Sequence, residues 1–474
     1  MTSVRRAGAE TFRSLHSRNF RLFFGGQLIS QIGNWMTMVA MTLLVLRLTG
    51  SGVALGLLAA AQFGPVLLIG PWAGLVADRS DKRHLLLIVQ TIAMVQSFAL
   101  AALAFADSPP IALIYVVALV GGITVAFDNP ARRAFVVEMV PEQDVNNAVS
   151  LNSALMTSSR VIGPALAGLL VTTVGFGWAF LADGLSYIAV IFALFLMRSA
   201  ELRRPPQQAR GKGQVREGLR YARSVPDLFV PLVMMAIVGT LSYNFQVVFP
   251  LFMTRDLGGT DSTFTLLFSV VSIGALIGAL AVARRKSISI RMVGLTAMGY
   301  GAALTVMTFV PSVAFALPAG LLVGLGSIAF LTASTSIVQM RSDPTMRGRV
   351  LALQAMVFLG STPIGGPILG WVCEHFGARY GVALGAVAAL GAGAWGMYEA
   401  RRIQETSTDP GEAGTFAVAV PAEAATTSVE DAIAELSHAA LPPERSERGE
   451  RVEPTADPPP KGTAGLDEHV PTTR

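Results

Sequence analysis

Twelve apolar segments of about 20 residues recur along this chain and constrain its fold more than any other feature. A helix of that length crosses a hydrocarbon layer about 30 Å thick, because it rises about 1.5 Å per residue. Soluble helices show one apolar stripe, whereas these segments are apolar all round, and only 14% of the residues are charged. We therefore predict an all-α polytopic membrane protein. Its predicted spans are 20–46, 52–77, 84–106, 111–130, 147–173, 176–197, 228–254, 262–283, 288–310, 313–337, 350–373 and 379–399.

Lysine and arginine are distributed unevenly among the connections, and this predicts the orientation. Connections rich in these residues stay on the cytoplasmic side. The predicted outer turns hold only Arg47, Arg255 and Arg379. We therefore expect a plasma-membrane protein with both termini and the central loop in the cytoplasm. The predicted cytoplasmic connections hold eight basic residues within 198–223, together with Arg79, Lys82, Arg83, Arg132, Arg133, Arg284, Arg285, Lys286, Arg291, Arg341, Arg347 and Arg349.

The charge of the final segment differs from that of the rest. Residues 403–474 hold five basic and fourteen acidic side chains and few large apolar ones, so we expect a disordered acidic tail. The predicted organisation is a cytoplasmic arm (1–19), a six-helix bundle (20–197), a central loop (198–227), a second six-helix bundle (228–400) and the tail (401–474).

Several function classes are excluded by what the sequence lacks. The net charge of +5 follows from topology, so we expect no nucleic-acid partner. Cys373 is the single cysteine, which leaves no disulfide framework and no CxxC metal or redox motif. No GxxxxGK[ST] loop is present to hold ATP phosphates. We therefore expect no enzyme, no metal, no cofactor and no ATP-driven pump.

The two halves of the apolar region repeat at an offset of 203 residues. The segment 141–168 aligns with 344–371, which places Gly163-Pro164 on Gly366-Pro367. Parallel repeats of this kind frame a site near the bilayer midplane at their interface. The sequence therefore predicts two pseudo-symmetric six-helix bundles.

This layout, the loop GLVADRSDKR (74–83) and the fifth-span GPALAG (163–168) resemble the major facilitator superfamily over about residues 15–400. The resemblance is greatest to the drug and siderophore exporter branch, which contains enterobactin exporters and macrolide-type efflux proteins. It implies the fold of that superfamily, a small-molecule substrate and coupling to protons. Because the twelve spans form a complete set, we expect a monomer to provide the pathway.

The loop after the second span is a candidate gate. Gly74 would let this end of the span approach a neighbouring helix closely. Asp78 would pair with a cation or with a helix N-terminus in only one of two access states. For Lys82 and Arg83 a purely topological role is an equal alternative. The superfamily signature is matched by Gly74, Asp78, Arg79, Lys82 and Arg83, with Asp81 where the pattern has Gly.

Small residues and proline interrupt the fifth span and its repeat. They allow close helix packing and a bend, and in the family the corresponding helices line the contact between the halves. We therefore expect spans 5 and 11 to perform equivalent work. The residues of the two motifs are Gly163, Pro164 and Gly168, and Gly366, Pro367 and Gly370, with Gly365 beside the second.

Arg160 is a charge deep within the fifth span, where it is costly and is expected to face a cavity or a partner. Asp183 is the one acid found within the adjacent span. We hypothesise that the two side chains pair, or that each faces a central water-filled cavity; a role in substrate binding or coupling and a structural role both remain open.

Other polar residues are weaker candidates for the pathway, because amides in membrane helices also bond to neighbouring helices. Asp128 is interpreted as a solvated cap at the end of span 4. Drug/proton antiporters of a related branch carry an arginine within span 4, and the predicted span has none. The amide candidates are Gln31 and Asn34, with Gln27 near them, Gln62, and Asn244 and Gln246, beside Tyr243.

The function that combines these features is secondary active export of amphipathic small molecules, such as drugs or siderophores, by alternating access and in exchange for protons. An uptake symporter on the same scaffold is one alternative. A transport-silent membrane receptor or assembly partner is another, although it would not need two access states.

Overall fold

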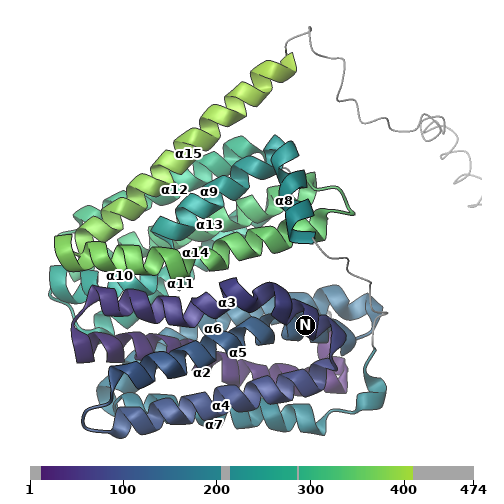
Figure 1. The fold of residues 1–474 in the computed structure, drawn as a ribbon, viewed down its shortest axis with the longest axis vertical. Coiled ribbons are helices and arrows are strands. Elements are labelled where there is room, and N and C mark those ends of the chain that lie inside the picture. The colour runs from purple at the N-terminus through teal and green to yellow at the C-terminus, as the bar shows by residue number, and fades with distance from the viewer. Residues whose placement is uncertain (1–11, 204–213, 286–287, 409–474) are drawn as a thin grey trace, which may run out of the picture. The chain divides into compact units, whose positions relative to one another are not determined.

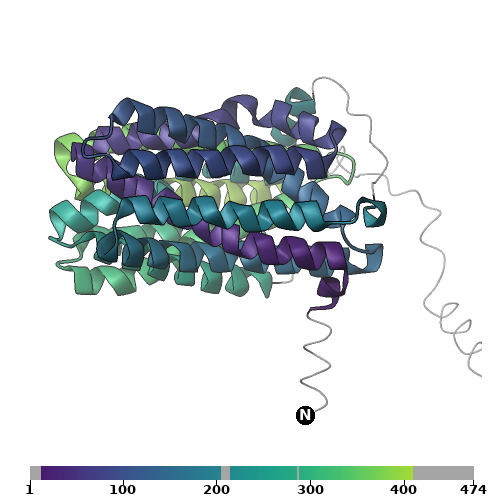
Figure 2. The same ribbon diagram turned by 90° about the horizontal axis from the view of Figure 1, so that it is seen from below.

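The computed structural model describes residues 12–203, 214–285 and 288–408. Within them, twelve spans are long and apolar enough to cross a membrane, which confirms the predicted number. Figures 1 and 2 show these helices running alongside one another. The predicted disordered tail beyond residue 408, the start of the N-terminal arm and residues 204–213 of the central loop lie outside the described residues.

The first half of the chain forms six long helices that follow the predicted spans, except that the fourth continues eight residues past its predicted end. Short 3₁₀ turns precede, interrupt and follow them at Arg13–His16 (η1), Glu142–Asp144 (η2) and Ser199–Glu201 (η3). The helices are α2 (Arg18–Thr49), α3 (Gly52–Arg79), α4 (Lys82–Phe105), α5 (Ile111–Glu138), α6 (Val145–Thr173) and α7 (Phe176–Leu196).

The second half repeats this pattern with one interruption. The seventh span is two α-helices separated at residues 243–244, followed by a π-helical turn. The central segment holds an additional helix, α8, and the last helix continues to Thr408, so the first residues assigned to the tail are helical. The elements are α8 (Gln214–Ser224), α9 (Pro226–Ser242), α10 (Phe245–Leu251), η4 (Phe252–Asp256), α11 (Asp261–Ala283), α12 (Ile290–Phe309), α13 (Val313–Arg341), α14 (Arg347–Phe376) and α15 (Ala378–Thr408).

Local chemistry explains the ends of several helices. Gly50 has φ +61°, a left-handed conformation that suits glycine, and it ends α2. Ser51 then caps α3 by accepting a hydrogen bond from the Ala54 backbone N–H at 3.3 Å. Asp81 caps α4 in the same way, with the Arg83 N–H at 3.0 Å. Asp81 therefore serves as a helix cap at the place where the superfamily signature has Gly.

The two ends of the bundle differ in their charges. We call the end where α3 finishes at Arg79 and α4 begins at Lys82 the basic end, because its connections hold most of the arginines. We call the end where α2 finishes at Thr49 and α3 begins at Gly52 the opposite end.

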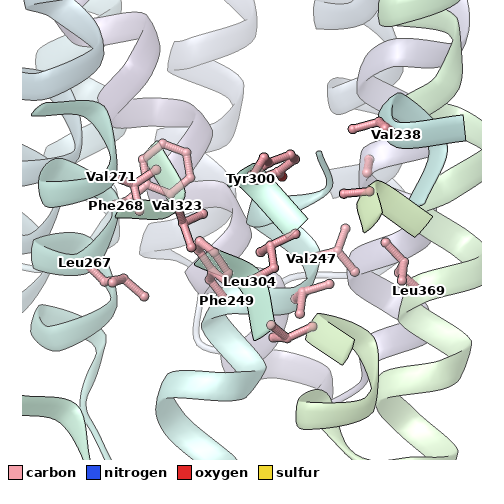
Figure 3. Packing of buried hydrophobic residues seen from close by; sticks show 14 of the residues in the cluster. Val238, Val247, Phe249, Leu267, Phe268, Val271, Tyr300, Leu304, Val323 and Leu369 are labelled. Carbon is pink, nitrogen blue, oxygen red and sulfur yellow. The ribbon is translucent and has the colours of Figure 1, made fainter. Parts of the chain in front are cut away.

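Apolar side chains are distributed as a bilayer requires. Buried apolar residues form two clusters, and Figure 3 shows part of the larger one, including Tyr300 and Leu304 of α12. Large apolar residues also cover the outside: Leu68 is 81% exposed and Phe309 77% exposed. In water such a surface would aggregate, whereas in lipid it is the expected covering.

Candidate functional site

The two halves of the chain meet at the opposite end through glycines of α3 and α14. A Cβ on Gly56 would lie 2.6 Å from the Gly366 carbonyl oxygen and 2.7 Å from Pro367 Cα. One turn away, Gly52 faces Gly370 in the same manner, with a would-be Cβ 2.6 Å from the Gly370 carbonyl oxygen. Backbone therefore packs on backbone at this crossing, which only glycine permits.

The Gly-Pro motif of the fifth span lies on α6, and one of its glycines contacts a helix of the second half. Gly168 of α6 packs directly on the Thr265 side chain of α11. Gly163 packs instead within its own half, where a Cβ would lie 2.5 Å from Trp35 Cβ. Spans 5 and 11 thus both bring a small residue of their motif onto a helix of the other half. The contact between halves that the resemblance implied is present.

Charged side chains add to the contact at the opposite end. Arg47 of α2 pairs with Asp261, the first residue of α11, with 2.6 Å between Nη2 and Oδ2. The Glu374 carboxylate on α14 accepts a hydrogen bond from the Gly52 backbone N–H and lies 3.9 Å from the Arg255 guanidinium. The Arg47 side chain is 55% exposed, so this pair contributes about 0.2–1 kcal/mol and the glycine crossings carry most of the contact.

The interface is more open toward the basic end. Gly74 of α3 has no atom within 4 Å of a would-be Cβ, so the close approach predicted for it is absent in this conformation. On α6, polar residues Asn146, Ser150 and Ser153 are exposed and Thr157 is partly exposed. Their three- and four-residue spacing puts them on the same face as Arg160. A polar stripe therefore runs along α6 from the basic end to Arg160.

Arg160 and Asp183 do not form the hypothesised pair. The Arg160 guanidinium lies over the Trp35 ring, 4.8 Å from its centroid, and the Tyr243 hydroxyl is an electrostatic neighbour. Asp183 points elsewhere, into the first half. The correction has a simple cause: depth along the helices allowed the pair, but the direction in which each helix turns its side chain did not.

Asp183 joins three helices by hydrogen bonds. Its carboxylate, in a residue only 1% exposed, accepts from Thr37 of α2 and from Ser97 of α4, both at 2.7 Å, and more weakly from Ser186. Gly33 leaves the space that the carboxylate fills. Among the residues that the structure describes, no cation forms an ion pair with this acid.

Asp128 is buried and paired, which contradicts its interpretation as a solvated cap. It forms an ion pair with Arg132 and accepts a hydrogen bond from Gln90 at 2.8 Å. Because α5 continues to Glu138, Arg132 lies within the helix of span 4 and is only 5% exposed. The predicted end of span 4 at residue 130, which left Arg132 in a loop, was therefore wrong, since the residues beyond it remain helical.

The loop after the second span is tied into the first half. Lys82 forms an ion pair with Glu138 of α5 at 2.8 Å, and both side chains are largely buried. Arg83 donates hydrogen bonds to the carbonyls of Leu194 at 2.8 Å and Phe195 at 3.1 Å, at the end of α7, where a cation is favoured. Both residues therefore make specific structural contacts in addition to any effect on topology.

The break in the seventh span brings aromatic side chains to the interface. The Tyr243 ring lies 5.1 Å from that of Phe358 on α14 and 5.9 Å from that of Phe245, and its hydroxyl donates to the Ser327 carbonyl. Asn244 donates to the Thr240 carbonyl at 2.8 Å, yet its own side-chain oxygen has no hydrogen bond within the described residues. The Gln246 side-chain oxygen is in the same situation.

The amides of α2 mostly contact their own half. Gln31 donates to Gln27 at 3.3 Å, and Asn34 donates to the Tyr187 hydroxyl at 3.4 Å. Gln62 of α3 contacts the Met41 sulfur at 3.4 Å. A bond within α2 thus accounts for Gln31, and contacts with neighbouring helices account for Asn34 and Gln62, without a ligand.

Sequence reasoning missed several residues that complete the site. Trp35 lacked a signal because an aromatic residue in an apolar span looks like core. Asp261 and Glu374 stand at helix ends and look like ordinary caps. In the described part of the chain, no three His, Cys, Asp or Glu side chains come close enough together to hold a metal ion.

The chain has twelve spans and glycine crossings between two repeated halves. Comparison with known proteins identifies a transporter family that agrees with these features. The family model described as transmembrane secretion effector matches residues 9–418. The chain belongs to the transmembrane secretion effector family. The resemblance to the major facilitator superfamily is thereby confirmed, and the family and fold are those of transporters, not enzymes.

Relatives of this transmembrane secretion effector are bacterial transporters. The staphyloferrin A transporter of Staphylococcus aureus is 25% identical over 361 residues, which cover 75% of this chain and 90% of that protein. Macrolide efflux protein A of Streptococcus pyogenes is 24% identical over 372 residues, covering 76% and 91%. With twelve spans and such relatives, the chain is a multi-pass plasma-membrane protein.

The fold also matches solved structures. A bacterial homologue of the human lysosomal transporter Spinster, crystallised in an inward-facing and unoccupied conformation, superimposes with a TM-score of 0.66. The match covers 83% of this chain and 98% of that one at 17% identity, so it supports the architecture alone.

Proposed function

We propose that this transporter is a secondary active exporter of amphipathic small molecules that works by alternating access. The observation that carries this proposal is the asymmetry of the interface between the halves. Glycines of α3 and α14 close it at the opposite end, whereas the polar stripe of α6 is exposed toward the basic end. A binding site reached from one end at a time is the requirement of alternating access.

The charge distribution supports an orientation with the basic end in the cytoplasm. Its connections and helix ends include Arg79, Arg284, Arg341 and Arg347, and the positive-inside rule assigns such connections to the cytoplasm. Both termini then lie in the cytoplasm as well. In this orientation the described conformation is open to the inside and closed to the outside, which is the state in which an exporter loads its cargo.

The loop after the second span would act in the other state. The open space around Gly74 leaves room for a neighbouring helix to approach when the basic end closes. Asp78 and Arg79 stand at the end of the same helix and would contribute polar contacts in that closed state. Lys82 and Arg83 would hold the loop in place through Glu138 and the end of α7.

Asp183 is the acid best suited to carry the coupling proton. The other buried acids of the first half have cations beside them: Asp128 has Arg132, Glu138 has Lys82, and Asp144 has Arg13. A buried carboxylate with hydroxyl donors alone keeps much of its desolvation cost, and taking up a proton removes the charge. Protonation would then change the hydrogen bonds by which the Asp183 carboxylate connects α2, α4 and α7.

The names of the relatives support cargo of the drug or siderophore type. One relative is named staphyloferrin A transporter and another macrolide efflux protein A. An uptake symporter on the same scaffold is the alternative that shares the geometry. A receptor without transport is disfavoured, because it would not need glycine crossings that can part. We expect a monomer to suffice, since one chain supplies both halves of the interface.

The test is accumulation of antibiotics and siderophores in efflux-deficient bacteria that produce the wild type, the Asp78→Asn variant or no transporter. We expect lower accumulation with the wild type alone, and we expect a protonophore to abolish the difference. Higher accumulation with the wild type would establish uptake instead. Equal accumulation across a broad panel would contradict transport of this cargo class.

A further inference from the structure

Arg160 is a charge in the middle of a membrane span that has no anionic partner in the described part of the chain. Its side chain makes no ion pair and no hydrogen bond there, and Asp183, the partner predicted from the sequence, accepts hydrogen bonds from Thr37 and Ser97 instead. The contact with the Trp35 ring contributes about 0.5–2 kcal/mol. A central arginine in a membrane costs more than that, so a further group must balance it.

The position of Arg160 on α6 directs it between the halves. Gly163 packs on α2 and Gly168 packs on α11. At about 100° per residue, Arg160 lies between these two directions, about 60° from the first and about 80° from the second. The electrostatic proximity of Tyr243, a residue of the second half, agrees with this direction.

The route to Arg160 is polar. Asn146, Ser150, Ser153 and Thr157 precede it on the same face of α6 and are exposed or partly exposed. Their counterparts on α14, at the repeat offset, are Arg349, Leu353, Met356 and Gly360, so a polar stripe does not continue along that helix beyond its first turn. The five N–H donors of the guanidinium thus stand at the inner end of a polar track that only one half provides.

The facing side is aromatic. The Tyr243 ring contacts those of Phe245 and Phe358, and each of the three residues is partly exposed. A cation on one side and three rings on the other would match a ligand that carries an anionic group on an aromatic or apolar body.

We propose that Arg160, held over Trp35, binds the carboxylate of the cargo, while Tyr243, Phe245 and Phe358 bind its apolar body. The cargo class is then amphipathic organic anions. This inference rests on the proposed function, because it names the cargo of the same pathway. It explains why a membrane span keeps an arginine that has no anionic partner among the described residues.

The test uses binding to the purified full-length protein in phosphatidylcholine nanodiscs, with no gradient, so that a failure of export does not affect it. The probes are tritiated 2-naphthoate and, as a competitor, 2-naphthamide, which has the same rings without the charge. We expect the wild type to bind 2-naphthoate at least tenfold more tightly than 2-naphthamide, because only the carboxylate can form a bidentate pair with a guanidinium.

Three variants separate a binding role from a structural one. We expect Arg160→Gln to reduce the preference for 2-naphthoate to less than twofold, and Arg160→Lys to retain part of it. Arg291→Gln, which removes an exposed cation at the start of α12, should leave the preference unchanged. The unfolding temperature of each variant establishes that it is folded. Equal binding of the two probes by the wild type, or an unchanged preference in folded Arg160→Gln, would overturn the proposal.

Discussion

Adding one methyl group at the α3–α14 crossing should open the closed end of this transporter. In the described state a Cβ on Gly56 would lie 2.6 Å from the Gly366 carbonyl oxygen, where ordinary contacts begin at 3.4 Å. The neighbouring atoms belong to backbone, so they cannot move aside as a flexible side chain can. Gly56→Ala therefore requires the two helices to separate by about 1 Å at this point, as overpacked cores do.

The size of the effect follows from the cost of overpacking, which is about 1–3 kcal/mol. Since about 1.4 kcal/mol corresponds to a tenfold change in an equilibrium, the ratio of this state to its alternative should fall about 5- to 150-fold. The gain in helix propensity from Gly to Ala is similar in both states, because α3 is helical in each, and it cancels from the ratio.

The assay is the labelling rate of a cysteine introduced on the polar stripe, Ser153→Cys, with a membrane-impermeant maleimide on protein in nanodiscs. The native Cys373 is buried, so the parent protein serves as the blank. We expect Gly56→Ala to slow the labelling of position 153 in proportion to the lost fraction of this state, because the basic end closes when the opposite end opens.

The matched control is Gly299→Ala on α12, where no atom lies within 4 Å of a would-be Cβ. It should leave the labelling rate within twofold of the parent. If Gly56→Ala labels as fast as Gly299→Ala and is equally stable, the α3–α14 crossing does not hold the closed end, and the gating argument is wrong.

Three further predictions concern charged groups that pair or bond with residues of the first half. Asp261→Asn should lower the ratio of the described state to its alternative by less than about fivefold, because the pair with the exposed Arg47 contributes only about 0.2–1 kcal/mol. In the same labelling assay, 0.5 M salt should have the same effect on the parent protein, because salt screens an exposed ion pair. Lys82→Met should lower stability by about 3–5 kcal/mol by leaving Glu138 buried without its cation, and adding Glu138→Gln should restore most of the loss in thermal unfolding. Asp183→Asn should fold, since an amide oxygen still accepts from the hydroxyls of Thr37 and Ser97, but its efflux should no longer depend on the proton gradient in vesicles; efflux that still follows the gradient would exclude Asp183 as the coupling group.

The spans were predictable because a bilayer leaves little freedom to a backbone. Each peptide group in hydrocarbon needs a hydrogen bond within its own segment, so an apolar run of sufficient length becomes a helix. Predicted spans such as 52–77 and 176–197 therefore differ from α3 and α7 by at most two residues at either end. The prediction was less successful at the basic end, where α5 continues past residue 130 and carries Arg132 into a buried position.

The break in the seventh span had no signal in hydropathy. Tyr243 and Asn244 interrupt the helix within a segment apolar enough to be predicted as one span. There the Tyr243 hydroxyl donates to the Ser327 carbonyl of α13, and the Ser242 carbonyl accepts from the Tyr300 hydroxyl of α12. Such breaks depend on neighbours that satisfy the freed backbone and side-chain groups. No pattern within the segment itself records those neighbours.

The sequence by itself determined that the chain crosses a membrane twelve times, that its two halves repeat, and that spans 5 and 11 carry equivalent glycines, because length, hydropathy and spacing are local properties. It also placed Arg160 and Asp183 within adjacent spans, offset by about 8 Å in depth on helix geometry. Only the tertiary structure decided that Arg160 lies over Trp35 while Asp183 joins Thr37 and Ser97. The physical reason is that depth follows from residue number along a helix, whereas the direction of a side chain around the helix axis is set by the neighbours against which that helix packs.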